Sequence, residues 1–192
     1  MLEVHPVTAD RWEELAAFFG PSGAFGHCWC TWWRQTGAES SKGVEKGGAA
    51  NRALMHEIVK AGSEPGLLAY RDGQPVGWIS VAPRPQYGRI IRSRRIGPEP
   101  EEAANERIWS VVCFWIPRRE RGKGVANGLL KAAVDHARAR GAAVLEAYPL
   151  DTAGGRHPPA NVFTGTLAMF QRAGFREVDR PRGAQLVVRR DL

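Results

Sequence analysis

The apolar run at residues 108–116, "IWSVVCFWI", constrains the fold of this chain more than any other feature. Its only polar residue is Ser110, so a strand formed by this run is apolar on both faces. Such strands lie in the middle of sheets that are covered on both sides. Turn residues follow, and apolar residues then recur with helical spacing over residues 123–140. The chain is therefore predicted to form a sheet with helices packed against it.

The other elements complete one α+β domain that spans residues 1–192, with no internal repeat and no long linker. The stretch "GLLAYRDGQPVGWISVA" predicts an antiparallel hairpin with its turn at Asp72-Gly73. The predicted order is βααβββαβαββ. Its remaining members are a strand at 2–7, helices at 8–19 and 46–61, an irregular stretch at 21–45, a loop at 83–106, strands at 107–116 and 142–150, helices at 123–140 and 162–173, and strands at 175–180 and 184–190 around a turn at 181–183.

The formal net charge is +7, which suits either plain solubility or an anionic partner such as a phosphorylated small molecule or nucleic acid. No stretch reaches the ~20 apolar residues of a membrane-spanning helix. The first residues lack the basic and apolar regions of a signal peptide, and three cysteines do not suggest a disulfide framework. We therefore expect a cytoplasmic protein that does not bind a membrane.

The junction after the apolar run, "PRRERGKGVANGLL", has the features of an anion site. The first turn of a helix has unpaired N–H groups and the positive end of the helix dipole. Gly122 and Gly124 would let a phosphate approach the backbone, and Arg119, Arg121 and Lys123 would add positive charge. The pattern suits a pyrophosphate, although it is neither a P-loop nor the Rossmann fingerprint. The alternative is a basic turn in which the two glycines allow tight packing of strand and helix.

This junction resembles the acetyl-CoA-binding motif of the GCN5-related N-acetyltransferase (GNAT) superfamily. Arg119, Gly122 and Gly124 stand at the three motif positions, and "FQRAGF" resembles the second motif of the family. The motifs cover about 108–176, and elements at about 8–62 match in order only, on the acceptor side. The resemblance implies the GNAT acyl-CoA N-acyltransferase fold, with a central mixed, mostly antiparallel sheet flanked by helices.

In the family, the strand before the motif splays from the next strand, and the pantetheine arm of acetyl-CoA lies in the gap. The resemblance implies that backbone groups of the first strand pair with pantetheine, and that N–H groups of the junction hold the pyrophosphate. The family often has Tyr at the position of Phe170, and Phe has no proton to give to the leaving thiolate. The implied coenzyme contacts are Phe114, Trp115, Ile116, Arg119, Arg121, Gly122, Lys123, Gly124, Val125, Ala126 and Phe170.

Candidate catalytic groups lie on the strand after the helix. Alternation places Glu146 and Tyr148 on one face, and a carboxylate inside an apolar run should be hydrogen-bonded or raised in pKa. We predict Glu146 as the base and Tyr148 as a replacement acid, although Tyr148 also fits a half-buried strand aromatic. Asp151 either binds the amine or caps the following turn.

The segment "HCWCTWWR" offers His27, Cys28 and Cys30 as metal-ligand types, but Cys-x-Cys is not a usual zinc spacing. We expect buried thiols, no metal, and an acceptor pocket lined by Trp29, Trp32 and Trp33. The arginine-rich stretch at 84–95 is either a solvated loop or a recognition element for an acidic acceptor. It lacks the patterns of nucleic-acid binders, so we expect no nucleic acid.

The predicted activity is direct transfer of an acetyl group from acetyl-CoA to a primary amine of a small molecule, in a ternary complex. A protein N-terminus or lysine is the alternative acceptor. A coenzyme-A-binding regulatory or interaction module with little catalysis is the alternative class. A homodimer is left open.

Overall fold

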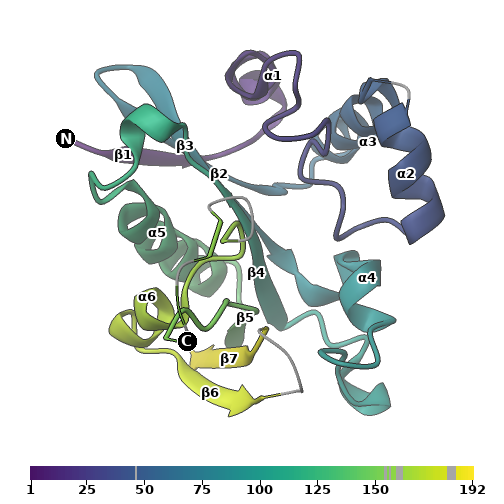
Figure 1. The fold of residues 1–192 in the computed structure, drawn as a ribbon, viewed down its shortest axis with the longest axis vertical. Helices are drawn as coiled ribbons and strands as arrows, with labels where there is room; N and C mark the ends of the chain where they lie inside the picture. Colours follow the sequence, from purple (N-terminus) through teal and green to yellow (C-terminus); the bar gives the residue numbers. More distant parts are fainter. Residues whose placement is uncertain (46, 154, 156, 159–161, 181–184) are drawn as a thin grey trace.

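The computed structural model describes residues 1–45, 47–153, 155, 157–158, 162–180 and 185–192. Its centre is a seven-stranded sheet with the order β1-β2-β3-β4-β5-β7-β6 (Figure 1). Every neighbouring pair is antiparallel except β4 and β5, which are parallel. The strands are β1 (Glu3–Pro6), β2 (Gly66–Arg71), β3 (Gln74–Pro83), β4 (Ile108–Trp115), β5 (Val144–Ala147), β6 (Arg176–Asp179) and β7 (Val187–Asp191).

Helices cover both faces of the sheet (Figure 1). Strand alternation separates two hydrophobic cores, since Leu67 and Ala69 of β2 join one and Leu68 and Tyr70 join the other. Helices α5 and α6 pack on the first core, and α1, α3 and α4 pack on the second. The α-helices are α1 (Trp12–Phe19), α2 (Gly37–Glu45), α3 (Ala49–Lys60), α4 (Gly88–Ile91), α5 (Val125–Ala139) and α6 (Leu167–Arg172).

Strand β4 is buried on both faces, as its sequence predicts: Val111 lies in one core and Val112 in the other. It pairs with β3 along its length, but with β5 only from Ile108↔Val144 to Val111↔Ala147. Beyond that point the two parallel strands separate, and β4 continues to Trp115 without β5 beside it. The predicted splay is therefore present.

Several predicted boundaries were wrong. The predicted helix at 8–19 is split into a 3-10 turn at Ala9–Arg11 and α1. The stretch predicted as irregular contains α2, whose start is a capping box: the Thr36 N–H donates to Glu39, and the Glu39 N–H donates to Thr36 Oγ1. The predicted loop at 83–106 contains α4 and the 3-10 turns Arg84–Gln86 and Pro100–Glu102.

Other predicted elements are shorter than expected. The predicted second helix begins at Ala49, and the last helix begins at Leu167 after its cap, Thr166, whose hydroxyl accepts a hydrogen bond from the Met169 N–H. Residue 46 and the predicted turn at 181–183 lie outside the described residues. Within the described ranges, no helix is both long enough and apolar enough to cross a lipid bilayer.

Candidate functional site

The turn between β4 and α5 exposes its backbone. Gly122 and Gly124 have φ of 74° and 79°, in the left-handed region that favours glycine, and a Cβ on either would meet no atom within 4 Å. Gly124 caps α5, so the N–H groups of its first turn point out of the helix end without helical partners. The structure therefore presents accessible amides where the sequence predicts an anion site.

Charged side chains surround this turn, and some of them are already engaged. Arg121 donates from Nε to the Ile116 carbonyl, 3.0 Å away. Glu120 pairs with Arg71 and with Lys123, which stabilises the turn but offsets part of its positive charge. Arg119 is exposed on the same turn. The positive charge available to a ligand comes mainly from Arg119, Arg121 and the helix end.

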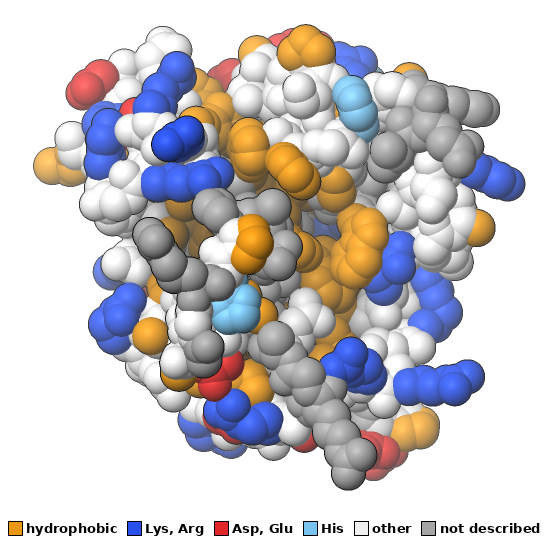
Figure 2. All heavy atoms as spheres, in the orientation of Figure 1, with side chains coloured by type: hydrophobic (Ala, Val, Ile, Leu, Met, Phe, Trp, Pro, Cys, Tyr) orange, Lys and Arg blue, Asp and Glu red, His pale blue; other side chains and the backbone are white. Residues whose placement is uncertain are grey.

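A cavity of about 900 Å³ opens beside this turn. Figure 2 shows hydrophobic side chains along a furrow in the middle of this face, with Lys and Arg side chains on both sides. The cavity is bounded by the end of β4 and by Arg121 and Ala126 of the α5 junction, which is residues 117–126. Its other walls are the tryptophan-rich segment at residues 27–34 and the segment before α6. It thus connects the exposed turn with the region predicted to bind the acceptor.

Backbone groups at the end of β4 face the gap beside β5. The Phe114 N–H donates to the Phe163 carbonyl at 2.6 Å, so Phe163 holds the place that β5 leaves. Because successive residues of a strand direct their polar groups to opposite sides, Trp115 directs its backbone toward β3. Trp115 lines the cavity, and the backbone contact predicted between Trp115 and pantetheine stays a prediction.

The three tryptophans predicted to bind the acceptor have different positions. Trp32 and Trp33 line the cavity, and Trp32 is 38% exposed. Trp29 lies in the core instead, stacked on Trp12 with ring centroids 6.0 Å apart. Trp29 does not line the cavity; it packs on Trp12 and Phe19 of α1 and so anchors the tryptophan-rich segment to the core.

All three cysteines line the cavity. The Sγ atoms of Cys30 and Cys113 are 3.4 Å apart. Burial raises the pKa of Cys28 to about 11, and the contact with Cys113 together with burial raises the pKa of Cys30 well above its ordinary value. Cys28 and Cys30 therefore remain thiols at neutral pH, and thiols are poor nucleophiles.

Glu146 and Tyr148 meet, as alternation predicts, and the Tyr148 hydroxyl donates to Glu146 Oε1. The Glu146 carboxylate also pairs with Arg84 at 3.2 Å and Arg189 at 2.7 Å. Burial, and then the charge of Glu146, raises the pKa of Tyr148 well above its ordinary value. Neither residue lines the cavity, but the Tyr148 ring stacks on Trp33 at 6.1 Å. This geometry favours a supporting role behind the cavity wall, and the predicted catalytic role remains a prediction.

Asp151 and Phe170 also point away from the cavity. Asp151 pairs with Arg180 at 2.9 Å and accepts a hydrogen bond from the Ala153 N–H, which is the turn-capping alternative. Phe170 is fully buried between Phe114 and Phe175. Direct contact of either side chain with a ligand therefore stays a prediction.

Sequence reasoning missed His157, which lines the cavity. It lies in a loop rich in Gly and Pro, "GGRHPP", which carries no periodic pattern that fixes its position. Among the described residues lining this cavity, the titratable side chains are His157, Arg121 and the three cysteines, and none is a carboxylate. An imidazole is the one group of these that exchanges a proton readily near neutral pH.

Comparison with known proteins identifies the family. The model of the acetyltransferase (GNAT) family matches residues 29–163, more than half of the chain. The chain belongs to the GNAT family. Comparison with curated proteins gives no match. The matched range includes β4, the α5 junction and the tryptophans Trp32 and Trp33.

Solved structures share this GNAT fold along the whole chain. A PaiA N-acetyltransferase from Thermoplasma acidophilum, solved in complex with coenzyme A, is 12% identical with a TM-score of 0.55, and 100% of this chain and 99% of that chain are covered. A ribosomal-protein-alanine N-acetyltransferase from Brucella melitensis is 18% identical with a TM-score of 0.55, covering 99% of both chains. A GCN5-related N-acetyltransferase from Kribbella flavida is 17% identical with a TM-score of 0.56, covering 100% and 98%. At these identities the likeness concerns the fold.

Proposed function

We propose that this protein is an acetyl-CoA-dependent N-acetyltransferase that acts on a primary amine of a small molecule. The observation that carries the proposal is the cavity of about 900 Å³, which joins the exposed α5 junction to the wall formed by Trp32 and Trp33. Its volume lies in the ~300–1,000 Å³ range of small-molecule sites. The coenzyme would enter from one end and the amine from the other.

The chain's residues fit the coenzyme. The amides from Arg121 to Ala126 would hold the diphosphate, since Gly122 and Gly124 leave open space around them. The end of β4, from Phe114 to Ile116, would lie along the pantetheine arm. When bound, acetyl-CoA supplies an acetyl group activated as a thioester. The raised pKa values of Cys28 and Cys30 keep these two side chains as thiols, so direct transfer to the amine in a ternary complex is favoured over acylation of either.

His157 is our candidate for the group that accepts the proton of the amine, because it lines the cavity. Its neighbour Asp151 has a pKa below the ordinary value because of hydrogen bonds from Arg180 and the Ala153 backbone, with a smaller effect of His157.

The roles predicted for Glu146 as a base and Tyr148 as an acid remain the competing proposal. Phe170 has no proton to give, and a thiol pKa near ~8.5 lets the thiolate leave unprotonated.

The test is thiol release from acetyl-CoA with a panel of primary amines, together with calorimetric titration of the coenzyme. We expect micromolar to submillimolar coenzyme binding and amine-dependent release. A coenzyme-binding module would bind without turnover, which would contradict the enzymatic proposal. Peptides with a free N-terminus or a lysine form a second arm, and faster acetylation of these peptides would contradict the small-molecule acceptor.

A further inference from the structure

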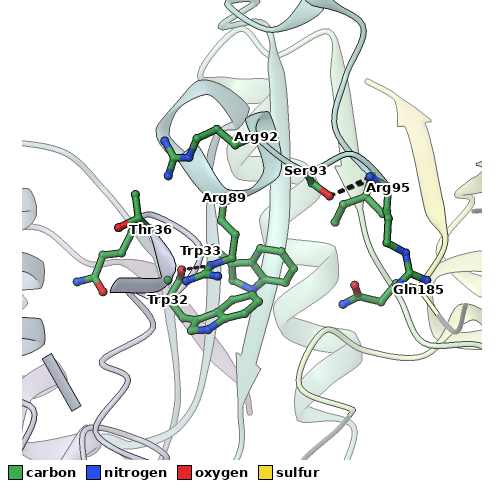
Figure 3. Close-up of a pocket in the computed structure, with 11 residues that line it drawn as sticks. Trp32, Trp33, Thr36, Arg89, Arg92, Ser93, Arg95 and Gln185 are labelled. Carbon is green, nitrogen blue, oxygen red and sulfur yellow. Dashed lines mark hydrogen bonds between the residues drawn. The ribbon is translucent and has the colours of Figure 1, made fainter. Parts of the chain in front are cut away.

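A second hollow of about 410 Å³, which we call the arginine pocket, lies between α4 and the tryptophan-rich segment. Figure 3 shows Arg89, Arg92 and Arg95 around it, with Trp32 and Trp33 below and Gln185 on the far side. The described residues that line it include no Asp or Glu. Three arginines therefore line one hollow whose described lining holds no carboxylate.

Arg89 is held rigidly at this pocket. Its Nε donates to the Trp32 carbonyl at 2.9 Å, and its guanidinium lies 3.9 Å above the Trp32 ring. Its Nη2 is buried, with no hydrogen-bond partner among the described residues. A buried donor without a partner costs ~1–3 kcal/mol, so an incoming acceptor atom would be bound favourably. A planar guanidinium fixed in this way suits a carboxylate or a phosphate.

Arg92 strengthens the case for an anion. Arg89 and Arg92 both line the pocket, and burial together with the charge of Arg92 lowers the pKa of Arg89. Neither of the two forms an ion pair with a carboxylate in the described part of the chain. Hydrogen bonds from Thr36 lower the pKa of Glu39, with a smaller effect of Arg92, so that carboxylate is already held at the start of α2.

The arginine pocket adjoins the cavity of about 900 Å³ described above, because Trp32 and Trp33 line both. Trp33 Nε1 and Gln35 Oε1 are further buried polar atoms without partners among the described residues. A ligand that crosses the two tryptophans could place an anionic group at the arginines and another group in the cavity. The two hollows thus lie on either side of the same two tryptophans.

We propose that the acceptor amine also carries an anionic group, a carboxylate or a phosphate, which binds in the arginine pocket while the amine reaches the cavity. This proposal rests on the proposed function and names its substrate class. The anionic group fixes the orientation of the acceptor, and the arginines discriminate against amines that lack it. A carboxylate and a phosphate share this chemistry, and the test separates them.

The test is calorimetric binding of matched amine pairs to the protein saturated with coenzyme A, so that the α5 junction is filled. The pairs are O-phosphoethanolamine with ethanolamine, and β-alanine with β-alaninamide. We expect one anionic member to bind about tenfold or more tightly than its neutral partner, which is about 1.4 kcal/mol. The pair that shows the preference identifies phosphate or carboxylate. Equal affinities within both pairs, or no binding by any member, would overturn the proposal.

Variants show whether the preference comes from the pocket. Arg92→Gln and Arg89→Gln should each reduce the preference at least several-fold, while Arg94→Gln should keep it. Arg94 lies in the same stretch, is exposed and does not line the pocket, so it controls for the loss of one charge. Because Arg89 also contacts Trp32, Arg92→Gln decides the outcome if Arg89→Gln misfolds. A preference that survives Arg92→Gln, or that falls equally in Arg94→Gln, would refute the assignment. Coenzyme binding and thiol release test the proposed function separately.

Discussion

Glu146 is 2% exposed, and its carboxylate lies between Arg84 and Arg189 at the core of the sheet. Arg84 is itself fully buried, and Arg189 also pairs with Glu102 at 2.7 Å. Removing one member of a buried ion pair leaves the remaining charge without compensation. The first consequence of losing this carboxylate is therefore a loss of stability.

We predict that Glu146→Gln lowers the free energy of unfolding by up to about 3–5 kcal/mol, because two guanidinium groups lose one of the two carboxylates that they share, with Glu102 remaining. Urea denaturation measures this change. Glu177→Gln is the control, since its pair with Arg180 lies at the surface and should cost at most about 1 kcal/mol. In the folded Glu146→Gln protein we expect kcat to be retained, because Glu146 does not line the cavity. A large fall in kcat at saturating substrates would establish the catalytic role predicted from sequence.

His157→Ala should lower kcat by about 10²-fold and leave coenzyme affinity unchanged, because His157 lines the cavity and an imidazole can accept a proton. Steady-state kinetics at saturating amine and acetyl-CoA provide the measurement. His5→Ala, on β1, is the control. An unchanged kcat in His157→Ala would remove His157 from the mechanism.

At the scale of elements, α5 offers a matched experiment at its two ends. Gly124 and Gly141 have φ of 79° and 80°, and a Cβ on either meets nothing within 4 Å. Gly124→Trp should weaken acetyl-CoA binding about 100-fold or more by covering the amides of the first turn. Gly141→Trp should bind normally while bearing the same backbone strain of ~1–3 kcal/mol. Calorimetry decides, and normal affinity in Gly124→Trp would contradict the diphosphate site.

The sequence predicts those elements that carry a strong period or a strong turn. The hairpin around Asp72-Gly73, the buried strand β4 and the helix α5 follow from alternation, turn chemistry and helical spacing. Helix α2 was missed because it has few apolar residues. The spacing of Thr36 and Glu39 is nevertheless that of a capping box, which predicts the start of a helix. Helix α4 is four residues long, and tertiary contacts such as the burial of Ile90 hold it in place.

At the scale of the whole molecule, the cavity lies where the two hydrophobic cores meet. Cys113 belongs to one core and Phe114 to the other, and both line the cavity.

We predict intersecting initial-velocity lines when both substrates are varied, as direct transfer in a ternary complex requires. Mass spectrometry after incubation with acetyl-CoA alone should show no acetylated protein, because the pKa values of Cys28 and Cys30 are raised. Parallel lines, or a stable acetyl-cysteine, would contradict this.

The exposed turn between β4 and α5 could be predicted because its residues are contiguous in sequence. The opposite wall of the cavity could not, because it is assembled from distant segments. Trp32, His157 and Phe163 meet at one cavity only through the path of loops. Alternation correctly paired Glu146 with Tyr148, but it does not reveal that Arg84 and Arg189 lie beside them.

The hydrogen bond from the Phe114 N–H to the Phe163 carbonyl has an energetic consequence for ligand recognition. A ligand that accepts a hydrogen bond from the Phe114 N–H must replace the Phe163 carbonyl. The exchange of one hydrogen bond for another contributes little net affinity. If acetyl-CoA is the donor, as proposed, its affinity must then derive chiefly from its nucleotide half and from apolar contacts. Short thioesters that lack the nucleotide should accordingly be weak donors for this protein, however well their reactive end matches.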